Sequence, residues 1–262
     1  MVLLHGWPGD RHDYRAVVPL LAGQRRVVVP DLRGFGETTG PADAPPTEFA
    51  ADAQAGSVIA LIEAVADGPV VVGGYDVGSR TAQAVARARP DLVRAMVISP
   101  PVPGVGNRIL SPDPQREFWY QSFHRLALAE RLLDGSPDAV REYLEHFWTH
   151  WSGPAYVPET AELDRLAAAY GRPGAFVASI NWYRSGSGAV ARALGEQTPD
   201  PADRIAPPTT LLWPEHDPLF PRAWSDKVDE WFADAHLTPV DGIGHFVPVE
   251  APEVFAEAIL SR

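Results

Sequence analysis

An aspartate stands at the tip of a strand–turn–helix pattern in the first third of the chain. The apolar run Val70–Val72 leads into Gly74-Tyr75-Asp76-Val77-Gly78, and a helical pattern follows directly. Glycines on both sides of the turn allow a tight backbone path and leave the central side chain exposed at the end of the strand. A carboxylate there can act as a nucleophile without a base, because its ordinary pKa of about 3.9 keeps it charged at neutral pH. The alternative is that Asp76 only caps the helix.

Residues in three other loops of the chain could act together with this carboxylate. Trp7 follows the first apolar run of the chain, in a loop that can direct a backbone N–H at Asp76. Asp217 and His245 each follow a later apolar run. The carboxyl ends of parallel strands meet at one edge of a sheet, so we expect these residues to lie together. Their chain order is that of a nucleophile, an acid and a histidine base. Taken singly, each has a plainer interpretation: a strand-ending turn for Trp7 and Asp217, and a packed loop histidine for His245.

Short β-branched runs alternate with helical patterns at both ends of the chain. This alternation predicts an α/β fold, with a mostly parallel sheet and helices on both faces. The predicted strands are Val2–Leu4, Val27–Val29, Val70–Val72, Ala95–Ile98, Thr210–Trp213 and Leu237–Val240. The predicted helices are Asp13–Leu21, Thr47–Val65, Ser79–Ala88, Arg116–Leu133, Pro137–His150, Glu159–Ala169 and Pro252–Leu260.

The middle of the chain has a different character. Residues 101–200 contain no convincing β-branched run and hold four tryptophans, Trp119, Trp148, Trp151 and Trp182. We therefore expect two domains: an α/β core made of residues 1–100 and 201–262, and a helical lid made of residues 101–200 that covers a pocket.

Composition excludes several classes of protein. Acidic residues outnumber basic ones by 34 to 22, which argues against nucleic acid or an anionic membrane as the main partner. Cysteine is absent, so there is no disulfide, zinc–thiolate site or thiol nucleophile. His146 and His150 have the spacing of helical metal ligands, but without an HExxH pattern the helical surface is the better interpretation. We expect a soluble cytoplasmic protein, monomeric or homodimeric, without a metal or organic cofactor.

The segments HGWPG, DLRGFGET, GGYDVGS, WPEHD and GIGHFVPVEAPE together resemble the α/β-hydrolase superfamily over nearly the whole chain. The aspartate at the centre of GGYDVGS resembles the one found in the branch that contains epoxide hydrolases and haloalkane and haloacetate dehalogenases. The resemblance implies an α/β-hydrolase fold with a helical cap inserted between the sixth and seventh family strands. The family normally has a strand hairpin before the HGWPG strand. We therefore expect either that the native start lies upstream of Met1 or that the sheet lacks its first strands and exposes an edge.

Two segments of the middle region narrow the resemblance. EFWYQSFH and INWYR are similar to the cap segments that carry the ring-opening tyrosines of epoxide hydrolases, which maps these roles onto Tyr120 and Tyr183. Each is alternatively a buried aromatic whose hydroxyl finds a local partner. Haloalkane dehalogenases usually have a halide-gripping Trp after the nucleophile, and haloacetate dehalogenases an Arg that holds the carboxylate. This chain has Val77 there, which together with the two tyrosines favours an epoxide over a halide, whereas Arg80, one turn further on, keeps a bound substrate carboxylate open.

The residue types suggest a mechanism. An aspartate suits displacement at an sp³ carbon and leaves an alkyl-enzyme ester, whereas a serine suits acyl transfer. His245, oriented by Asp217, would deprotonate the water that hydrolyses the ester, and the backbone N–H groups of Trp7 and Val77 would hold the oxyanion. The tyrosine hydroxyls would supply a proton to the opening ring. The expected substrates are water and a small apolar epoxide, which becomes a vicinal diol. The predicted substrate-binding residues are His5, Phe35, Trp119, Phe123, Trp148 and Trp182.

Two other functions stay open. A haloalkane or haloacetate dehalogenase would use the same Asp76 ester but would release halide. A ligand-binding protein of this fold would have no turnover, although it would have no use for a water-activating pair such as Asp217 and His245.

Overall fold

A parallel sheet forms the centre of the protein. The computed structural model describes residues 1–38 and 44–262. In this part of the chain five strands pair in the order β1-β2-β3-β4-β5, all parallel. Because every strand runs the same way, the loops that follow them meet at one edge of the sheet. The strands are β1 (Val2–Leu4), β2 (Val70–Gly74), β3 (Val93–Ile98), β4 (Thr209–Pro214) and β5 (Ala235–Val240).

The strand predicted at Val27–Val29 is reduced to a single parallel bridge between Val28 and Val2. The Leu3 N–H donates to Val28 O, and the Val28 N–H donates to Met1 O, both at 3.0 Å. This segment therefore covers the outer side of β1. The other five predicted strands are confirmed within a few residues.

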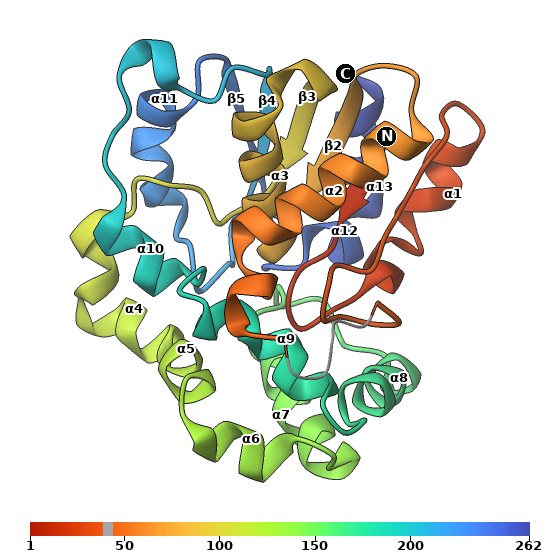
Figure 1. Ribbon diagram of the computed structural model, residues 1–262, viewed down its shortest axis with the longest axis vertical. Helices are drawn as coiled ribbons and strands as arrows, with labels where there is room; N and C mark the ends of the chain where they lie inside the picture. Colours follow the sequence, from red (N-terminus) through yellow and green to blue (C-terminus); the bar gives the residue numbers. More distant parts are fainter. Residues whose placement is uncertain (39–43) are drawn as a thin grey trace.

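Helices cover both faces of the sheet (Figure 1). A Cβ placed on Gly73 of β2 would meet Ile259 and Phe255 of one helix, whereas one placed on the next residue, Gly74, would meet Gly78 of another. Successive residues of a strand point to opposite faces, so these two helices, α13 and α3, flank the sheet from opposite sides. The helices of this part are α1 (Val17–Ala22), α2 (Ala51–Val65), α3 (Val77–Ala88), α11 (Val228–Trp231), α12 (Val247–Glu250) and α13 (Pro252–Leu260).

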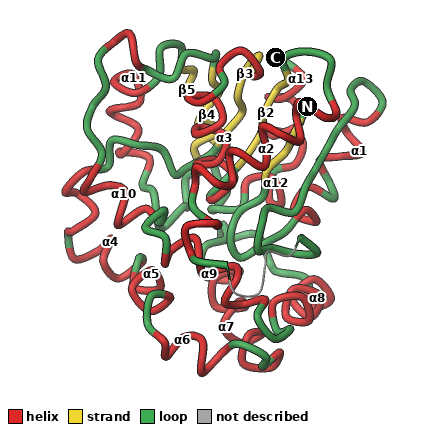
Figure 2. Tube along the Cα trace, in the orientation of Figure 1, coloured by secondary structure: helices red, strands yellow, loops and turns green. Residues whose placement is uncertain are grey.

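The chain between β3 and β4 is helical, and we call it the helical segment. Most of it lies below the carboxyl edge of the sheet in the view of Figure 1, and Figure 2 shows helix and loop along it. Its helices are α4 (Pro112–Glu117), α5 (Trp119–His124), α6 (Ala127–Leu133), α7 (Pro137–His150), α8 (Thr160–Tyr170), α9 (Ala175–Arg184) and α10 (Ala189–Gly195). Short 3₁₀ helices occur at Arg11–Tyr14, Pro46–Phe49, Pro90–Leu92, Gly106–Leu110, Pro201–Asp203 and Arg222–Lys227.

One helix prediction in this segment is wrong in a way that matters for the site. The single helix expected over Arg116–Leu133 is three helices, because Phe118 (ψ 9°) and Leu126 (ψ 143°) leave helical geometry. The first break turns the chain so that α5 presents Tyr120 to the sheet edge. Helices α9 and α10 were not predicted, while the helix at Pro137–His150 is confirmed.

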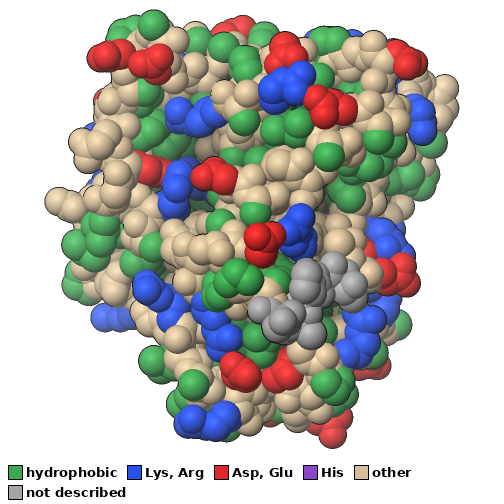
Figure 3. Space-filling model, viewed as in Figure 1, with side chains coloured by type: hydrophobic (Ala, Val, Ile, Leu, Met, Phe, Trp, Pro, Cys, Tyr) green, Lys and Arg blue, Asp and Glu red, His purple; other side chains and the backbone are tan. Residues whose placement is uncertain are grey.

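The predicted α/β-hydrolase fold is confirmed by this sheet and its flanking helices. On the face seen in Figure 3, acidic and basic side chains alternate without a large patch of one sign. In residues 1–38 and 44–262 no helix combines the length and apolar character that a membrane span needs.

Candidate active site

Asp76 sits on a strained turn between β2 and α3. It is the only residue other than glycine with positive φ (48°) in the described part of the chain. This conformation is costly for a residue with a side chain and persists where the surroundings impose it. Its N–H donates to Pro100 O at 3.1 Å. A Cβ on Gly78 would lie 2.0 Å from Leu4 O, so only glycine lets α3 start this close to β1. The GYDVG pattern thus holds one carboxylate at the sheet edge.

The two oxygens of the Asp76 carboxylate have different neighbours. Oδ1 accepts a hydrogen bond of 2.8 Å from the Trp7 N–H. Oδ2 lies 3.5 Å from Nε2 of His245. Val77, the first residue of α3, contributes a backbone N–H that has no partner within its own helix. One oxygen is therefore fixed by backbone, and the other faces the imidazole.

His245 is buried and held from behind by Asp217. Its Nδ1 lies 2.9 Å from Asp217 Oδ2, while Oδ1 of the same aspartate accepts the Leu219 N–H at 2.8 Å. Burial lowers the pKa of His245, but the charges of Asp217 and Asp76 and their hydrogen bonds outweigh it and raise the pKa to about 10. The imidazole is therefore protonated at neutral pH as long as both carboxylates are charged.

A glutamate that the sequence analysis missed organises the histidine loop. Glu250, at the end of α12, accepts backbone N–H groups of Gly153 (2.7 Å), Gly244 (2.9 Å) and Phe246 (3.1 Å). The His245 N–H donates to Trp151 O at 2.7 Å. The loop is thus bonded to the helical segment just after α7 as well as to its own helix. A carboxylate five residues after the histidine was the available signal.

Tyr120 and Tyr183 reach the same point from the helical segment. Their rings meet edge to face at 5.5 Å, and each ring also packs on Trp7. Burial raises the pKa of both hydroxyls, and the nearby charge of Asp76 raises it further. Both groups therefore stay protonated at neutral pH and can donate a hydrogen bond or a proton. The Tyr120 hydroxyl also accepts from Gln121 Nε2 at 3.1 Å.

Asp76, Tyr120 and Tyr183 line one small cavity. Its volume is about 10 Å³, about the space of one water molecule. Its described lining also includes Val77, Arg80, Pro101, Phe118, Gln121, Trp182, Ser187, Ala189 and Phe220. Phe118 and Gln121 lie within two residues of Tyr120 in the sequence, so their closeness to a predicted site residue could have indicated them. Ser187 lies four residues after Tyr183 and Phe220 three residues after Asp217, so both were also near predicted site residues.

Of the six predicted substrate-binding residues, Trp182 belongs to this cavity lining. His5 is buried behind it, with Nδ1 bonded to Gly6 O and Nε2 accepting the Leu32 N–H, both at 3.0 Å. Phe35 packs on His5 and lines a separate pocket. Trp148 stacks on Phe246 and donates to Pro8 O at 3.2 Å, which ties the helical segment to the first loop.

Trp119 and Phe123 pack on each other in the helical segment, and Trp119 is exposed. The structure gives these two side chains a packing role and leaves their substrate contact a prediction. Among the described residues no three side chains of His, Asp or Glu converge in a way that would hold a metal ion.

Comparison with known proteins agrees with the fold. A family model described as alpha/beta hydrolase fold matches residues 1–252. A soluble epoxide hydrolase of Corynebacterium sp. (strain C12) is 28% identical, with 99% of this chain and 88% of the relative covered. A fluoroacetate dehalogenase of Burkholderia sp. is 27% identical over 71% of this chain and 62% of its own. The solved structure of the epoxide hydrolase CorEH has a TM-score of 0.83 at 27% identity, covering 99% and 89% of the two chains. The chain belongs to the α/β-hydrolase family.

Proposed function

We propose that this protein is an epoxide hydrolase that works through an ester on Asp76 and releases a vicinal diol. The observation that carries the proposal is the shared cavity: a charged carboxylate faces two tyrosine hydroxyls that stay protonated. A strained ring ether needs both a nucleophile at carbon and a proton at oxygen, and groups of both kinds line this one cavity. The relatives named as epoxide hydrolases support the same assignment.

The first step opens the ring. Oδ2 of Asp76 attacks a ring carbon while Oδ1 stays bonded to the Trp7 N–H. The carbon–oxygen bond of the ring breaks, and its electron pair takes a proton from Tyr120 or Tyr183. The products are a hydroxyalkyl ester of Asp76 and a tyrosinate. The distinct neighbours of the two carboxylate oxygens support Oδ2 as the attacking atom.

The second step hydrolyses the ester. Esterification removes the negative charge of Asp76, which is one of the influences that raise the pKa of His245. The imidazolium can then give its proton to the tyrosinate, and the neutral imidazole acts as a base toward water. The hydroxide formed adds to the ester carbonyl, and the Trp7 and Val77 N–H groups hold the oxyanion. The imidazolium protonates the leaving alkoxide, and the proton of the restored Asp76 carboxyl passes to His245, which regenerates the starting charges of all three groups. No cofactor enters these steps.

We further propose that the helical segment acts as a cap over an α/β core, with residues 101–200 as the cap. A cavity of about 10 Å³ cannot hold an epoxide with any substituent. Side chains of the helical segment, which contribute Tyr120, Trp182 and Tyr183, must therefore move apart to admit the substrate. A cytoplasmic location and a monomeric or homodimeric state remain part of this proposal.

The second candidate is a dehalogenase with the same nucleophile. The Burkholderia relative and the position of Arg80 in the cavity lining favour it. Val77 does not, because its side chain can hold neither a halide nor a carboxylate. A halide also leaves without a proton donor, so the two buried tyrosines would have no task.

The proposal is tested by trapping the ester. His245→Gln removes the base, so the intact mass of the denatured variant should increase by one whole epoxide molecule during incubation with an epoxide panel. Peptide mapping should place the added mass on Asp76, and Asp76→Ala/His245→Gln should gain nothing. A gain equal to a halogenated substrate minus halide would instead assign a dehalogenase. No adduct with either panel would refute the ester mechanism.

A further inference from the structure

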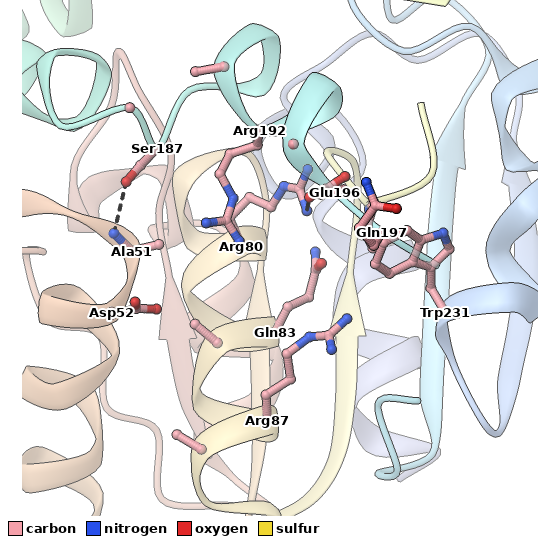
Figure 4. Close-up of a pocket in the computed structure, with 16 residues that line it drawn as sticks. Ala51, Asp52, Arg80, Gln83, Arg87, Ser187, Arg192, Glu196, Gln197 and Trp231 are labelled. Carbon is pink, nitrogen blue, oxygen red and sulfur yellow. Dashed lines mark hydrogen bonds and ion pairs between the residues drawn. The ribbon is translucent and has the colours of Figure 1, made fainter. Parts of the chain in front are cut away.

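A large pocket next to the catalytic cavity has no part in the steps above. Its volume is about 710 Å³, within the range of small-molecule sites. Figure 4 shows Arg80, Gln83 and Arg87 projecting into it from α3, with Arg192 and Glu196 on the opposite wall at α10 and the residue after it. The remaining wall includes Trp231 of α11.

This pocket and the catalytic cavity share two lining residues, Arg80 and Ser187. A second pocket of about 340 Å³, lined by Phe35 and Asn181 among others, shares none with the cavity. The large pocket therefore adjoins the cavity that Asp76 lines, and it offers the room that this closed cavity lacks.

The walls of the pocket carry an excess of positive charge in a chain of net charge −12. Three arginines, Arg80, Arg87 and Arg192, face two carboxylates, Asp52 and Glu196. Arg80 and Glu196 form an ion pair of 2.9 Å, with each side chain 10% exposed. Burial lowers the pKa of Arg80, Glu196 opposes this, and the charges of Arg192 and Arg87 lower it further. The arginines thus repel one another, and the two carboxylates leave one positive charge of the pocket wall uncompensated.

Buried hydrogen-bonding atoms in the same walls lack partners within the described part of the chain. They are the donors Arg80 Nε and Trp231 Nε1 and the acceptor Glu196 Oε2. An unpaired buried donor destabilises the folded protein, so natural sites usually supply a partner from solvent or a ligand. Two free donors beside excess positive charge fit an acceptor that is itself anionic.

We propose that this pocket binds the anionic group of the substrate, so that the epoxide is carried by an organic acid whose carboxylate contacts the arginines. The inference rests on the proposed function, and it changes the expected apolar substrate to an amphiphilic one. Arg80 and Ser187, which line both spaces, mark the place where the substrate passes from the pocket to Asp76. The aromatic lining around Tyr183 then contacts the carbon chain.

The test compares acids with neutral counterparts of the same shape. Epoxides at the end of carboxylic acid chains of increasing length are assayed beside their primary amides, and kcat/KM is measured for each. Hydrogen bonds to charged groups are worth enough to predict a preference for the acid of about tenfold or more at the best chain length.

Substitutions in the pocket wall test which residues cause the preference for acids over amides. Arg192→Gln and Arg87→Gln change exposed arginines of the pocket wall, and each should lower the acid-to-amide ratio several-fold. Arg116→Gln, on α4 and paired only with Asp113, is the matched control and should leave the ratio unchanged. Calorimetric titration with cyclopropane analogues of the acids, which cannot be opened, measures binding without turnover; Arg192→Gln should weaken it.

The two proposals fail in different ways. If acids and amides are opened equally well and the analogues bind the wild type and Arg192→Gln alike, the anion site is refuted while the epoxide hydrolase stands. If neither compound is opened and no adduct forms, the proposed function fails, and the titration still decides whether the pocket binds carboxylates.

Discussion

The sheet edge and the helical segment contribute to the site in opposite ways. The sheet edge supplies the charged groups, Asp76, Asp217 and His245, on loops that directly follow strands and are fixed by backbone hydrogen bonds. The helical segment supplies neutral hydroxyls, Tyr120 and Tyr183, from helices that pack through aromatic rings. In the proposed mechanism the sheet edge forms and cleaves the ester, and the helical segment, whose side chains would move apart to admit substrate, delivers the proton. The two sides should therefore respond differently to substitution.

The largest effect is expected on the sheet side. Asp76→Ala removes the nucleophile, so diol formation should fall by about 10⁴-fold or more, as for other nucleophilic enzymes. The rate of epoxide loss measures this, and thermal unfolding checks that the variant folds. Near-normal turnover in a folded variant would mean that water attacks the ring without Asp76.

The helical side should affect only ring opening. Tyr120→Phe and Tyr183→Phe should each lower kcat/KM for epoxides by about 10²-fold, because each removes a proton donor. Pre-steady-state mass spectrometry should show slower ester formation with unchanged ester hydrolysis.

The matched control for these variants is Tyr143→Phe, whose hydroxyl bonds His124 outside the cavity lining. Its effect should be far smaller. An equal loss in all three variants would assign the tyrosines to packing rather than chemistry.

The charge on Asp76 should control the pKa of His245. Asp76→Asn should lower that pKa from about 10, because the charge of Asp76 is one of its causes. NMR titration of the imidazole measures it in both proteins. A pKa that does not change in Asp76→Asn would contradict the proposed switch of His245 from acid to base.

The raised pKa of His245 also makes the stability of the protein depend on pH. The folded pKa lies above the ordinary value of 6.5, so the interaction stabilises fully below pH 6.5 and is lost as pH rises toward about 10. Wild type should lose stability relative to His245→Gln across this window. A constant difference between the two unfolding curves would contradict the assignment.

A smaller effect, on stability, is expected where the histidine loop of the sheet edge is bonded to the helical segment. Glu250→Gln leaves at least one of three backbone N–H groups without an acceptor, at a cost of about 1–3 kcal/mol in the free energy of unfolding. Chemical denaturation measures this, and exposed Glu253→Gln on α13 is the control. Equal stability of the two variants would show that Glu250 does not hold the histidine loop.

The smallest effect concerns the contact between the helical segment and the first loop. Trp148→Phe loses the hydrogen bond to Pro8 O but keeps a ring to stack on Phe246, so it should cost about 0.5–1.5 kcal/mol. If opening of the helical segment limits turnover, this variant should also raise kcat. A loss of kcat as large as that of Tyr183→Phe would contradict this placement.

The comparison also explains what the sequence could predict. Asp76, Asp217 and His245 each follow a strand within a few residues, so local patterns and the rule for parallel sheets were enough to bring them together. Tyr120 and Tyr183 were assigned by resemblance, because local sequence patterns do not predict how a helix is oriented toward the sheet edge. The breaks at Phe118 and Leu126 and the helices α9 and α10 were missed, since contacts between distant segments, such as that of Tyr183 in α9 with Trp7, do not show in the local sequence.

Contacts between residues that are distant in the sequence could not be predicted from local patterns. The ion pair of Arg80 and Glu196 joins residues on α3 and just after α10, and no periodicity relates the two. The same holds for the bonds from Glu250 to Gly153. His5 was predicted to touch substrate, but its two ring nitrogens are taken by backbone groups, which sequence patterns do not reveal.

The most direct test of the ester on Asp76 is a single turnover of the wild-type protein, in excess over an epoxide, in water labelled with ¹⁸O. The account predicts an unlabelled diol, with the label in the Asp76 carboxylate, because the oxygen of the new hydroxyl comes from the protein. A labelled diol and an unlabelled Asp76 after the first turnover would show direct attack by water and contradict the account.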